Sequence, residues 1–387
     1  MIEIIVAALA AILAPLIVYS IRDDIKQFIH AQILIRRPFR ANTIRSLSEI
    51  LGVDQNVKRL LIAERNRNGK DYFAIGNCIE LTKSSNLQNG WFTDKLSCVI
   101  DPEPFKLVFG FQRLCDEWKQ NNPKNPDKKR YILSDIIGQN TSDAPFIQFK
   151  FRESTFGKIF PIESSLDKSI EIEESNYGVP RKRFVSQLLS LSESPIPNCF
   201  GFHIIAKTTD GYIVFGQRSK YADYYPNLWS ASCEEQMAEE DFSKANPFVG
   251  GVRRALEEEF GIPAVDEGVH VRLLSVFLEY DVMNTNCCAV ADVHLTSEEL
   301  KQRWFEIASD KEEAAKLTFI SSDFETLVRS LLTGELNVDG KESITEEWHP
   351  TTKYRLFMFC ASEYGIFRLQ ELIKRIYLEL DRQIKPS

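Results

Sequence analysis

The chain has 387 residues, a formal net charge of −8 and a pI near 5.4, which argues against a general nucleic-acid binder. Hydrophobic residues make up 44% and aromatic residues 11%, so the chain is of a globular class with a large core, and its length predicts two domains. Its eight Cys and five His lack zinc-site spacing and a disulfide framework, which favours a reducing compartment.

The first twenty residues stand apart by their hydropathy. The 17 residues from Ile4 to Ser20 carry no charge and would span about 26 Å as a helix, near the lower limit for a bilayer. Residues 1–20 are therefore predicted to be a transmembrane anchor, with a cleaved signal peptide or a buried helix as alternatives. The acidic start, Met-Ile-Glu, and the lack of a small-x-small cleavage site oppose the signal peptide.

Residues 21–50 are predicted to form a basic juxtamembrane helix. Between residues 21 and 45 six bases stand against two acids, and apolar residues recur at helical spacing. By the positive-inside rule this flank is cytoplasmic, so we expect a single-pass membrane protein with the bulk of the chain in the cytoplasm.

Residues 51–195 are predicted to be an α+β region, and no motif in them indicates a role. Short apolar runs between Asn/Gly turns predict strands, one longer pattern predicts a helix, and Asn and Pro content predicts a loop. The strands are expected at 60–63, 71–75 and 96–100, the helix at 105–119 and the loop at 120–130.

The pattern sharpens after Ser194-Pro-Ile-Pro197. Two apolar runs, 200–207 and 212–219, flank Thr208-Thr-Asp-Gly211, and an Asp-Gly turn in this setting predicts a β-hairpin. A loop, a third strand and an acidic insert are expected next, at 220–228, 229–237 and 238–245. Further on, strands are expected at 271–280 and 286–295, and helices from Ser297, at 324–332 and at 363–382.

One helix between these strands is marked at both ends. Asn246 can cap it, Pro247 suits its first position, Gly261 can end it in a left-handed turn, and Pro263 prevents continuation. Its last turn holds Glu257-Glu-Glu259, where the helix dipole and mutual repulsion both oppose negative charge. This unfavourable placement indicates that a cation binds there.

The end of this helix, Arg254-Ala-Leu-Glu-Glu-Glu-Phe-Gly-Ile262, resembles the second half of the Nudix box, Arg-Glu-apolar-x-Glu-Glu-x-Gly-apolar. Ala255 stands where the family usually has Glu, and the Gly-x5-Glu half of the box is missing. Arg218 and Trp229 also fit the family's pattern. Over 196–335 the order of elements resembles the Nudix fold, which implies an α/β class: an α/β/α sandwich with a mixed sheet, followed by a helical extension at 336–387.

The resemblance implies a metal site. Glu258 and Glu259 would hold Mg²⁺ or Mn²⁺, and Arg254 would orient a carboxylate through charge-assisted hydrogen bonds. Glu235, or Glu234 beside it, would supply the carboxylate missing from the box. The alternative is an Arg–Glu ion pair on a solvated helix, with no role in metal binding.

Three further expectations concern neighbouring residues. Arg218 would contact a phosphate, with an ordinary surface arginine as the alternative. In the acidic insert, Glu239, Glu240 and Asp241 are weaker candidates for the missing carboxylate, and the insert is expected to be a solvated loop. Cys233 resembles the proton-donating Cys of the Nudix-fold isopentenyl diphosphate isomerase, but the neighbours of that Cys are not reproduced, so we expect a small buried residue.

The resemblance implies metal-dependent hydrolysis of a nucleoside diphosphate linked to another moiety. The expected partners are thus a nucleotide or other diphosphate small molecule, and a membrane through the N-terminal helix. A different class of function is the alternative: a Nudix-fold nucleotide sensor without hydrolysis, in a membrane-tethered regulatory or defence protein. Ala255 favours the sensor, whereas Glu258 and Glu259 favour the enzyme.

Overall fold

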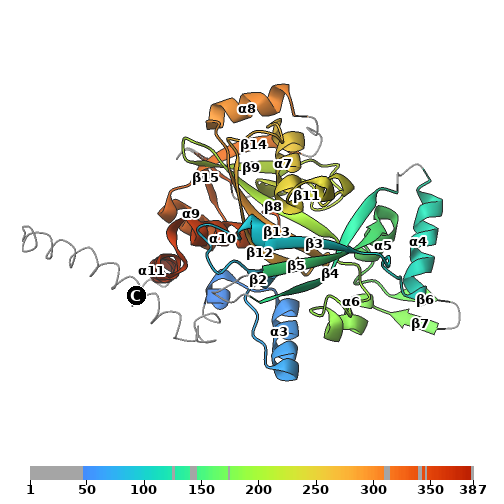
Figure 1. Ribbon diagram of the computed structural model, residues 1–387. Coiled ribbons are helices and arrows are strands. Elements are labelled where there is room, and N and C mark those ends of the chain that lie inside the picture. Colours follow the sequence, from blue (N-terminus) through green and yellow to red (C-terminus); the bar gives the residue numbers. More distant parts are fainter. Residues whose placement is uncertain are drawn as a thin grey trace, which may run out of the picture. The chain divides into compact units, whose positions relative to one another are not determined.

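The computed structural model describes seven stretches of the chain (Figure 1): residues 47–123, 127–139, 146–172, 175–308, 314–338, 342–344 and 347–384. The predicted anchor at 1–20 and nearly all of the predicted helix at 21–50 lie outside the described residues. Within these stretches, no helix combines the length and apolar character needed to cross a bilayer. Residues Ser48–Ser387 form one compact unit.

A nine-stranded mixed sheet forms the centre of this unit (Figure 1). β13 and β8 pair in parallel and the other neighbours are antiparallel, which confirms the predicted α/β class with a mixed sheet. The order is β1 (Ala74–Ile75), β2 (Cys78–Lys83), β12 (His270–Glu279), β13 (Asn284–Asp292), β8 (Phe200–Lys207), β9 (Tyr212–Arg218) and β10 (Trp229–Ala231), with β11 (Cys233–Gln236) on β8 and β14 (Ala314–Ser321) on β9.

The structure confirms the strands expected at 200–207, 212–219, 271–280 and 286–295, with small shifts at their ends. The single strand expected at 229–237 is wrong. It divides at Ser232 into β10, which pairs with β9, and β11, which pairs with β8. This division places Glu234 and Glu235 next to β8.

α7 (Pro247–Phe260) begins and ends where the sequence predicts. The Asn246 side chain accepts a hydrogen bond from the backbone N–H of Val249 at 3.1 Å, and Gly261 ends the helix at φ 69°. Gly251 lies against β8, where an added Cβ would come within 2.2 Å of the Phe202 ring. The helix therefore packs unusually close to the sheet.

Strand alternation assigns the two faces of the sheet to different partners. On β8, Phe202 and Ile204 join the core cluster that contains α7 residues, whereas His203 faces the other way, with its Nδ1 2.9 Å from Thr351 Oγ1. The first face is also covered by a three-stranded sheet of β3 (Leu96–Asp101), β5 (Phe146–Thr155) and β4 (Lys129–Gln139).

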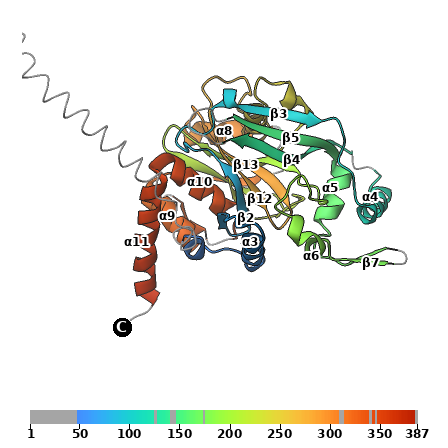
Figure 2. The same ribbon diagram turned by 60° about the horizontal axis from the view of Figure 1, so that its bottom comes forward.

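The second face is covered by α10 (Thr352–Tyr364), which packs with α9 (Phe324–Thr333) and α11 (Ile366–Ile384). Figures 1 and 2 both show these three helices grouped together, away from the three-stranded sheet. The Tyr354 ring of α10 lies 4.6 Å from the Phe277 ring of β12. Layers thus cover both faces of the mixed sheet.

Three local expectations are corrected. The run at 60–63 lies inside a helix, α3 (Gln55–Asn68), and is not a strand. The helix expected at 363–382 is two helices, α10 and α11, separated at Gly365, where φ is 85°. Thr296, not Ser297, caps α8 (Ser297–Glu306), since its side chain accepts from the Glu299 N–H.

The remaining elements complete the unit. They are α4 (Phe109–Asn121), α5 (Phe156–Glu163), α6 (Pro180–Phe184), the 3₁₀ turns η1 (Thr93–Lys95), η2 (Val185–Gln187) and η3 (Glu239–Ser243), and the hairpins β6 (Ile170–Ile172) with β7 (Ser175–Gly178) and β15 (Leu336–Val338) with β16 (Glu342–Ile344). The domain boundaries proposed at 195 and 335 stay predictions, although β2 and α10 pack on the sheet from outside those limits.

Candidate functional site

A cavity of about 170 Å³ opens where β8, β11 and the ends of β12 and β13 meet the loop after β9. Its wall carries both acidic and basic groups. Glu235, one of the predicted site residues, lines it from β11, and Arg218 lines it from the end of β9. Gly201, at the start of β8, lies between them and the β12–β13 hairpin. This cavity is the candidate site.

Arg254 of α7 contacts several acidic side chains beside this cavity. Its Nε and Nη2 lie 3.1 Å from the two oxygens of Asp241, and its Nη1 lies 3.2 Å from Glu258 and 3.4 Å from Glu235. The Nη2 also donates to the carbonyl of Gln236 at 2.7 Å. The predicted residues Arg254, Glu235 and Glu258 are therefore brought together.

Within this cluster, Glu258 has a raised pKa. Burial, and then the neighbouring carboxylate of Glu235, raise the pKa of Glu258 to about 7, although Arg254 opposes the shift. Two carboxylates this close repel each other once both are ionised. A divalent cation between them would relieve that repulsion, so the pair suits an oxygen-ligated metal.

The structure places Glu259 away from this pair. Its side chain is buried and lines a second cavity, of about 20 Å³, together with Arg218, Cys233 and Glu234. The predicted metal pair Glu258 and Glu259 is thus divided between two environments. Cys233 is buried as expected, and burial, then the charge of Glu259, hold its pKa well above the ordinary value.

Asp241 belongs to the site, although the sequence places it in a solvated loop. The residue is 0% exposed, and it binds Arg254 through both carboxylate oxygens. It also accepts from the backbone N–H of Ala238 at 2.9 Å, which fixes the turn η3. Glu239 and Glu240 remain largely exposed, as expected for the insert.

Arg218 is already engaged. It donates to Glu234 Oε2 at 2.6 Å and to the carbonyl of Tyr224 at 3.0 Å, while it lines both cavities. Glu234 receives a second guanidinium on its other oxygen, from Arg355 of α10, at 2.5 Å. Arg355 is 0% exposed and also donates to Ser230 Oγ at 2.5 Å. A phosphate at Arg218 would have to compete with Glu234.

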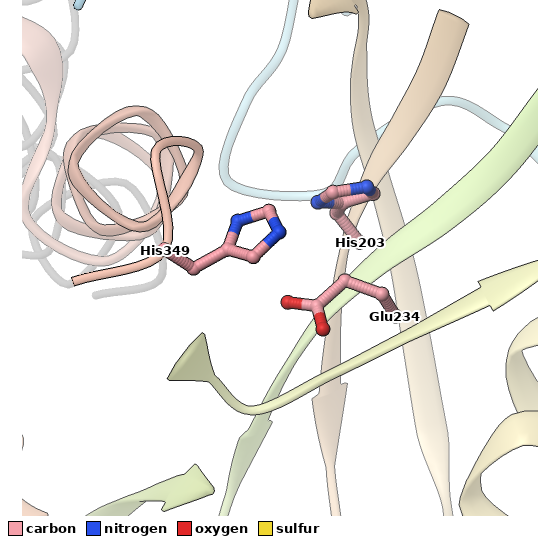
Figure 3. A group of neighbouring side chains, drawn as sticks. All are labelled: His203, Glu234 and His349. Carbon is pink, nitrogen blue, oxygen red and sulfur yellow. The ribbon is translucent and has the colours of Figure 1, made fainter. Parts of the chain in front are cut away.

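A further group of potential ligands surrounds Glu234. Figure 3 shows the side chains of His203, Glu234 and His349 turned toward one another from different parts of the chain. Their ligand atoms all lie within 4.8 Å of one another. Among the described residues, this is the only group of three or more His, Cys, Asp or Glu side chains with such spacing. No sequence motif marks this group, because the two His are 146 positions apart in the chain.

The charges around this group oppose a metal. Burial alone would raise the pKa of Glu234, but Arg355 and Arg218 hold it well below the usual range, so the carboxylate is ionised and matched by two guanidinium groups. Burial, with Arg355, lowers the pKa of both imidazoles, that of His349 to about 3. A dication would face two arginines and one carboxylate, so the group fits a buried charge-paired clamp better than a metal site.

Comparison with known proteins adds no family. No family model and no curated protein match the chain. A structural comparison matches the crystal structure of DR0079 from Deinococcus radiodurans at 11% identity and a TM-score of 0.27, over 40% of this chain and 80% of that one. A similarity at this level carries no argument about fold or function.

Proposed function

We propose that the chain is a Nudix-type hydrolase with an α/β/α sandwich, which uses Mg²⁺ or Mn²⁺ to cleave a nucleoside diphosphate linked to another moiety. The observation that carries this proposal is the cluster in which Arg254 holds Glu235, Asp241 and Glu258 beside the cavity of about 170 Å³. Layers on both faces of a mixed sheet support the fold.

The residues present fit a divalent metal in number and kind. Glu235 and Glu258 would hold it, since Mg²⁺ needs one or two carboxylates and keeps several waters. The metal would shield the charge of the diphosphate and activate a water. Arg254 fixes both carboxylates, and Asp241, buried behind it, keeps the guanidinium in place.

A second candidate function, a nucleotide sensor that does not hydrolyse its ligand, is favoured by one observation. Ala255 is 0% exposed within the core cluster, and Glu259 faces the smaller cavity, so the helix offers the larger cavity fewer carboxylates than a full Nudix box. The anchor and the cytoplasmic location are also proposals, and they rest on residues 1–50 of the sequence.

Metal-dependent product release tests the proposal. The full-length chain is incubated with nucleoside diphosphates linked to sugars, nucleosides or phosphate, with and without Mg²⁺ or Mn²⁺, and released phosphate and nucleotide are measured. We expect release only with metal, and its loss in Glu258→Gln and Glu235→Gln. Glu257→Gln is the matched control, since this neighbour is exposed and should keep activity.

The same samples separate the two candidate functions. Nucleotide binding without product would support the sensor and contradict the hydrolase. If neither metal nor any nucleotide shifts the melting curve, both proposals fail, and the carboxylates around Arg254 are a structural ion-pair network.

A further inference from the structure

The β12–β13 hairpin presents uncharged hydrogen-bonding groups to the cavity that Glu235 also lines. We propose that Glu279, Asn284 and Asn286, here called the hairpin wall, select a nucleobase: an uncharged planar heterocycle with a donor and an acceptor on one edge. This inference rests on the proposed function for the position of the diphosphate, at Glu235.

Unpaired polar atoms in the cavity are the first observation. Among the described residues, Asn284 Oδ1 and Gln236 Oε1 are buried and have no hydrogen-bond partner, and both residues line this cavity. Glu279 is only 3% exposed; one of its carboxyl oxygens has a long contact, 3.5 Å, with Asn286 Nδ2, and its carboxyl group also interacts with the Tyr225 hydroxyl. Buried polar atoms normally have partners, so two orphans in one cavity point to a ligand that supplies them.

The protonation of Glu279 agrees with an uncharged ligand. Burial raises the pKa of Glu279 to about 8; Tyr225 opposes this shift, and the charges of Asp281 and Glu234 add to it. At neutral pH the group is therefore mainly a carboxylic acid, which donates one hydrogen bond and accepts another. Asn284 and Asn286 offer the same pair of functions. This combination matches the edge of a nucleobase better than it matches a cation or an anion.

Gly201 connects the hairpin wall to the acidic cluster. A Cβ at Gly201 would lie 2.9 Å from Asn286 Oδ1 and 3.0 Å from the carbonyl oxygen of Glu235. The absence of a side chain lets the Asn286 amide approach the Glu235 backbone at the base of the cavity. One ligand can therefore contact the hairpin wall and Glu235 at once.

The cavity's size and aromatic lining narrow the ligand further. Its volume of about 170 Å³ is below the roughly 300–1,000 Å³ of pockets that enclose a drug-sized ligand, so it takes one ring system and leaves the rest of the ligand outside. Phe156 and Tyr225, which are partly exposed, also line it. Aromatic side chains stack on any base, while the hairpin wall would choose among bases.

Calorimetric titration of the full-length chain tests this inference. The probes are the non-hydrolysable methylene diphosphonate analogues of adenosine, guanosine, cytidine and uridine diphosphate, with methylenediphosphonate as the base-free probe, all with Mg²⁺. We expect at least one nucleoside probe to bind tenfold or more tightly than the base-free probe. Equal binding of all five probes would overturn the inference.

Variants at Glu279 and at Glu163 test whether the preference for a nucleobase depends on the hairpin wall. Glu279→Gln keeps a donor and an acceptor, so the preference should stay within threefold, whereas Glu279→Leu should lose at least tenfold. Glu163→Leu is the matched control: Glu163 is buried and hydrogen-bonded to Tyr224, and burial raises its pKa to about 8, but it does not line the cavity. Retained preference in Glu279→Leu would overturn the inference.

A replacement variant and the hydrolysis assay complete the test. If Glu279→Leu does not fold, Asn284→Leu, at a partly exposed position, replaces it, and unchanged preference there would count against the hairpin wall. Metal-dependent hydrolysis of base-free and base-containing diphosphates alike would leave the proposed function intact and remove the nucleobase inference alone. Base-selective binding without hydrolysis would do the reverse.

Discussion

Glu258 makes the stability of the protein depend on pH. Because its pKa is raised to about 7, the folded state keeps this proton to a higher pH than the unfolded chain, whose ordinary value is 4.5. The free energy of unfolding therefore falls as pH rises from about 4.5 to about 7. Without metal, we expect the melting temperature of Glu258→Gln to rise relative to that of the unmodified protein as the pH increases across this range.

Scanning calorimetry at several pH values checks this expectation. Glu257→Gln removes an equally negative but exposed neighbour and should show no such trend. A difference between Glu258→Gln and the unmodified protein that stays constant from pH 4.5 to 7 would contradict the raised pKa.

The pair of Arg254 and Asp241 gives a second prediction for single residues. Asp241→Ala leaves a largely buried guanidinium without its two-pronged partner, and breaking a buried pair typically costs about 3–5 kcal/mol. Glu240→Ala removes a carboxylate 3.9 Å from the same guanidinium but 60% exposed, which should cost about 0–1 kcal/mol. Urea unfolding measures both, and equal losses would contradict the assigned role of Asp241.

At the scale of residues, the sequence predicted which types of side chain matter better than where they point. Arg254, Glu235 and Glu258 do converge. Glu258 and Glu259 do not, and helix geometry explains this, since consecutive residues point about 100° apart at 3.6 residues per turn. The burial of Asp241 was not readable, because it depends on where the turn η3 meets α7.

Among the elements, α7 depends on the glycine that lets it approach the sheet. Gly251→Ala would place a methyl group 2.2 Å from the Phe202 ring in the core, and overpacking typically costs about 1–3 kcal/mol. Gly250→Ala meets Lys244 at 2.6 Å, but that side chain is exposed and can move, so we expect a smaller loss or none. Denaturant unfolding should separate the two, and a loss as large in Gly250→Ala would contradict the close packing at Gly251.

The sequence predicted elements with local signals and missed those without them. The ends of α7 follow from Asn246 and Gly261, and the β8–β9 hairpin follows from its Asp-Gly turn. α10 was missed because most of its length is buried, so no polar face marks its helical period. The apolar run at 60–63 was taken as a strand because runs this short do not separate the two periodicities.

At the scale of the whole molecule, the C-terminal segment is part of the core. Arg355 pairs with Glu234 at 2.5 Å, Trp348 forms a bridge with Trp229, and Tyr354 packs on Phe277. We expect a chain that ends at residue 346 to lose cooperative thermal unfolding, followed by circular dichroism, and to bind the dye ANS. A chain that ends at Ile384 keeps α11 and should melt like the full chain. Cooperative melting of the shorter chain would contradict this role.

From the sequence alone, residues 51–195 and 336–387 are interpreted as additions to a central domain, because no sequence signal marks contacts between distant segments. In the folded chain, Cys78 of β2 pairs with Glu279 of β12, and α10 covers the face that carries His203. Both additions therefore lie beside the candidate site, and its surroundings could not be predicted from the Nudix-like stretch alone.

The parallel pairing of β8 with β13, which joins Phe200 to Thr285, also bears on how the protein is made. Such long-range pairs form slowly, because a long loop must close before any contact is gained. During synthesis, Glu234 has Arg218 beside it early, but Arg355 leaves the ribosome near the end. Until then the sheet face around Phe277 has no cover. From the completion of β12 until α10 emerges, the nascent chain therefore exposes an apolar surface, and such surfaces promote aggregation or chaperone binding.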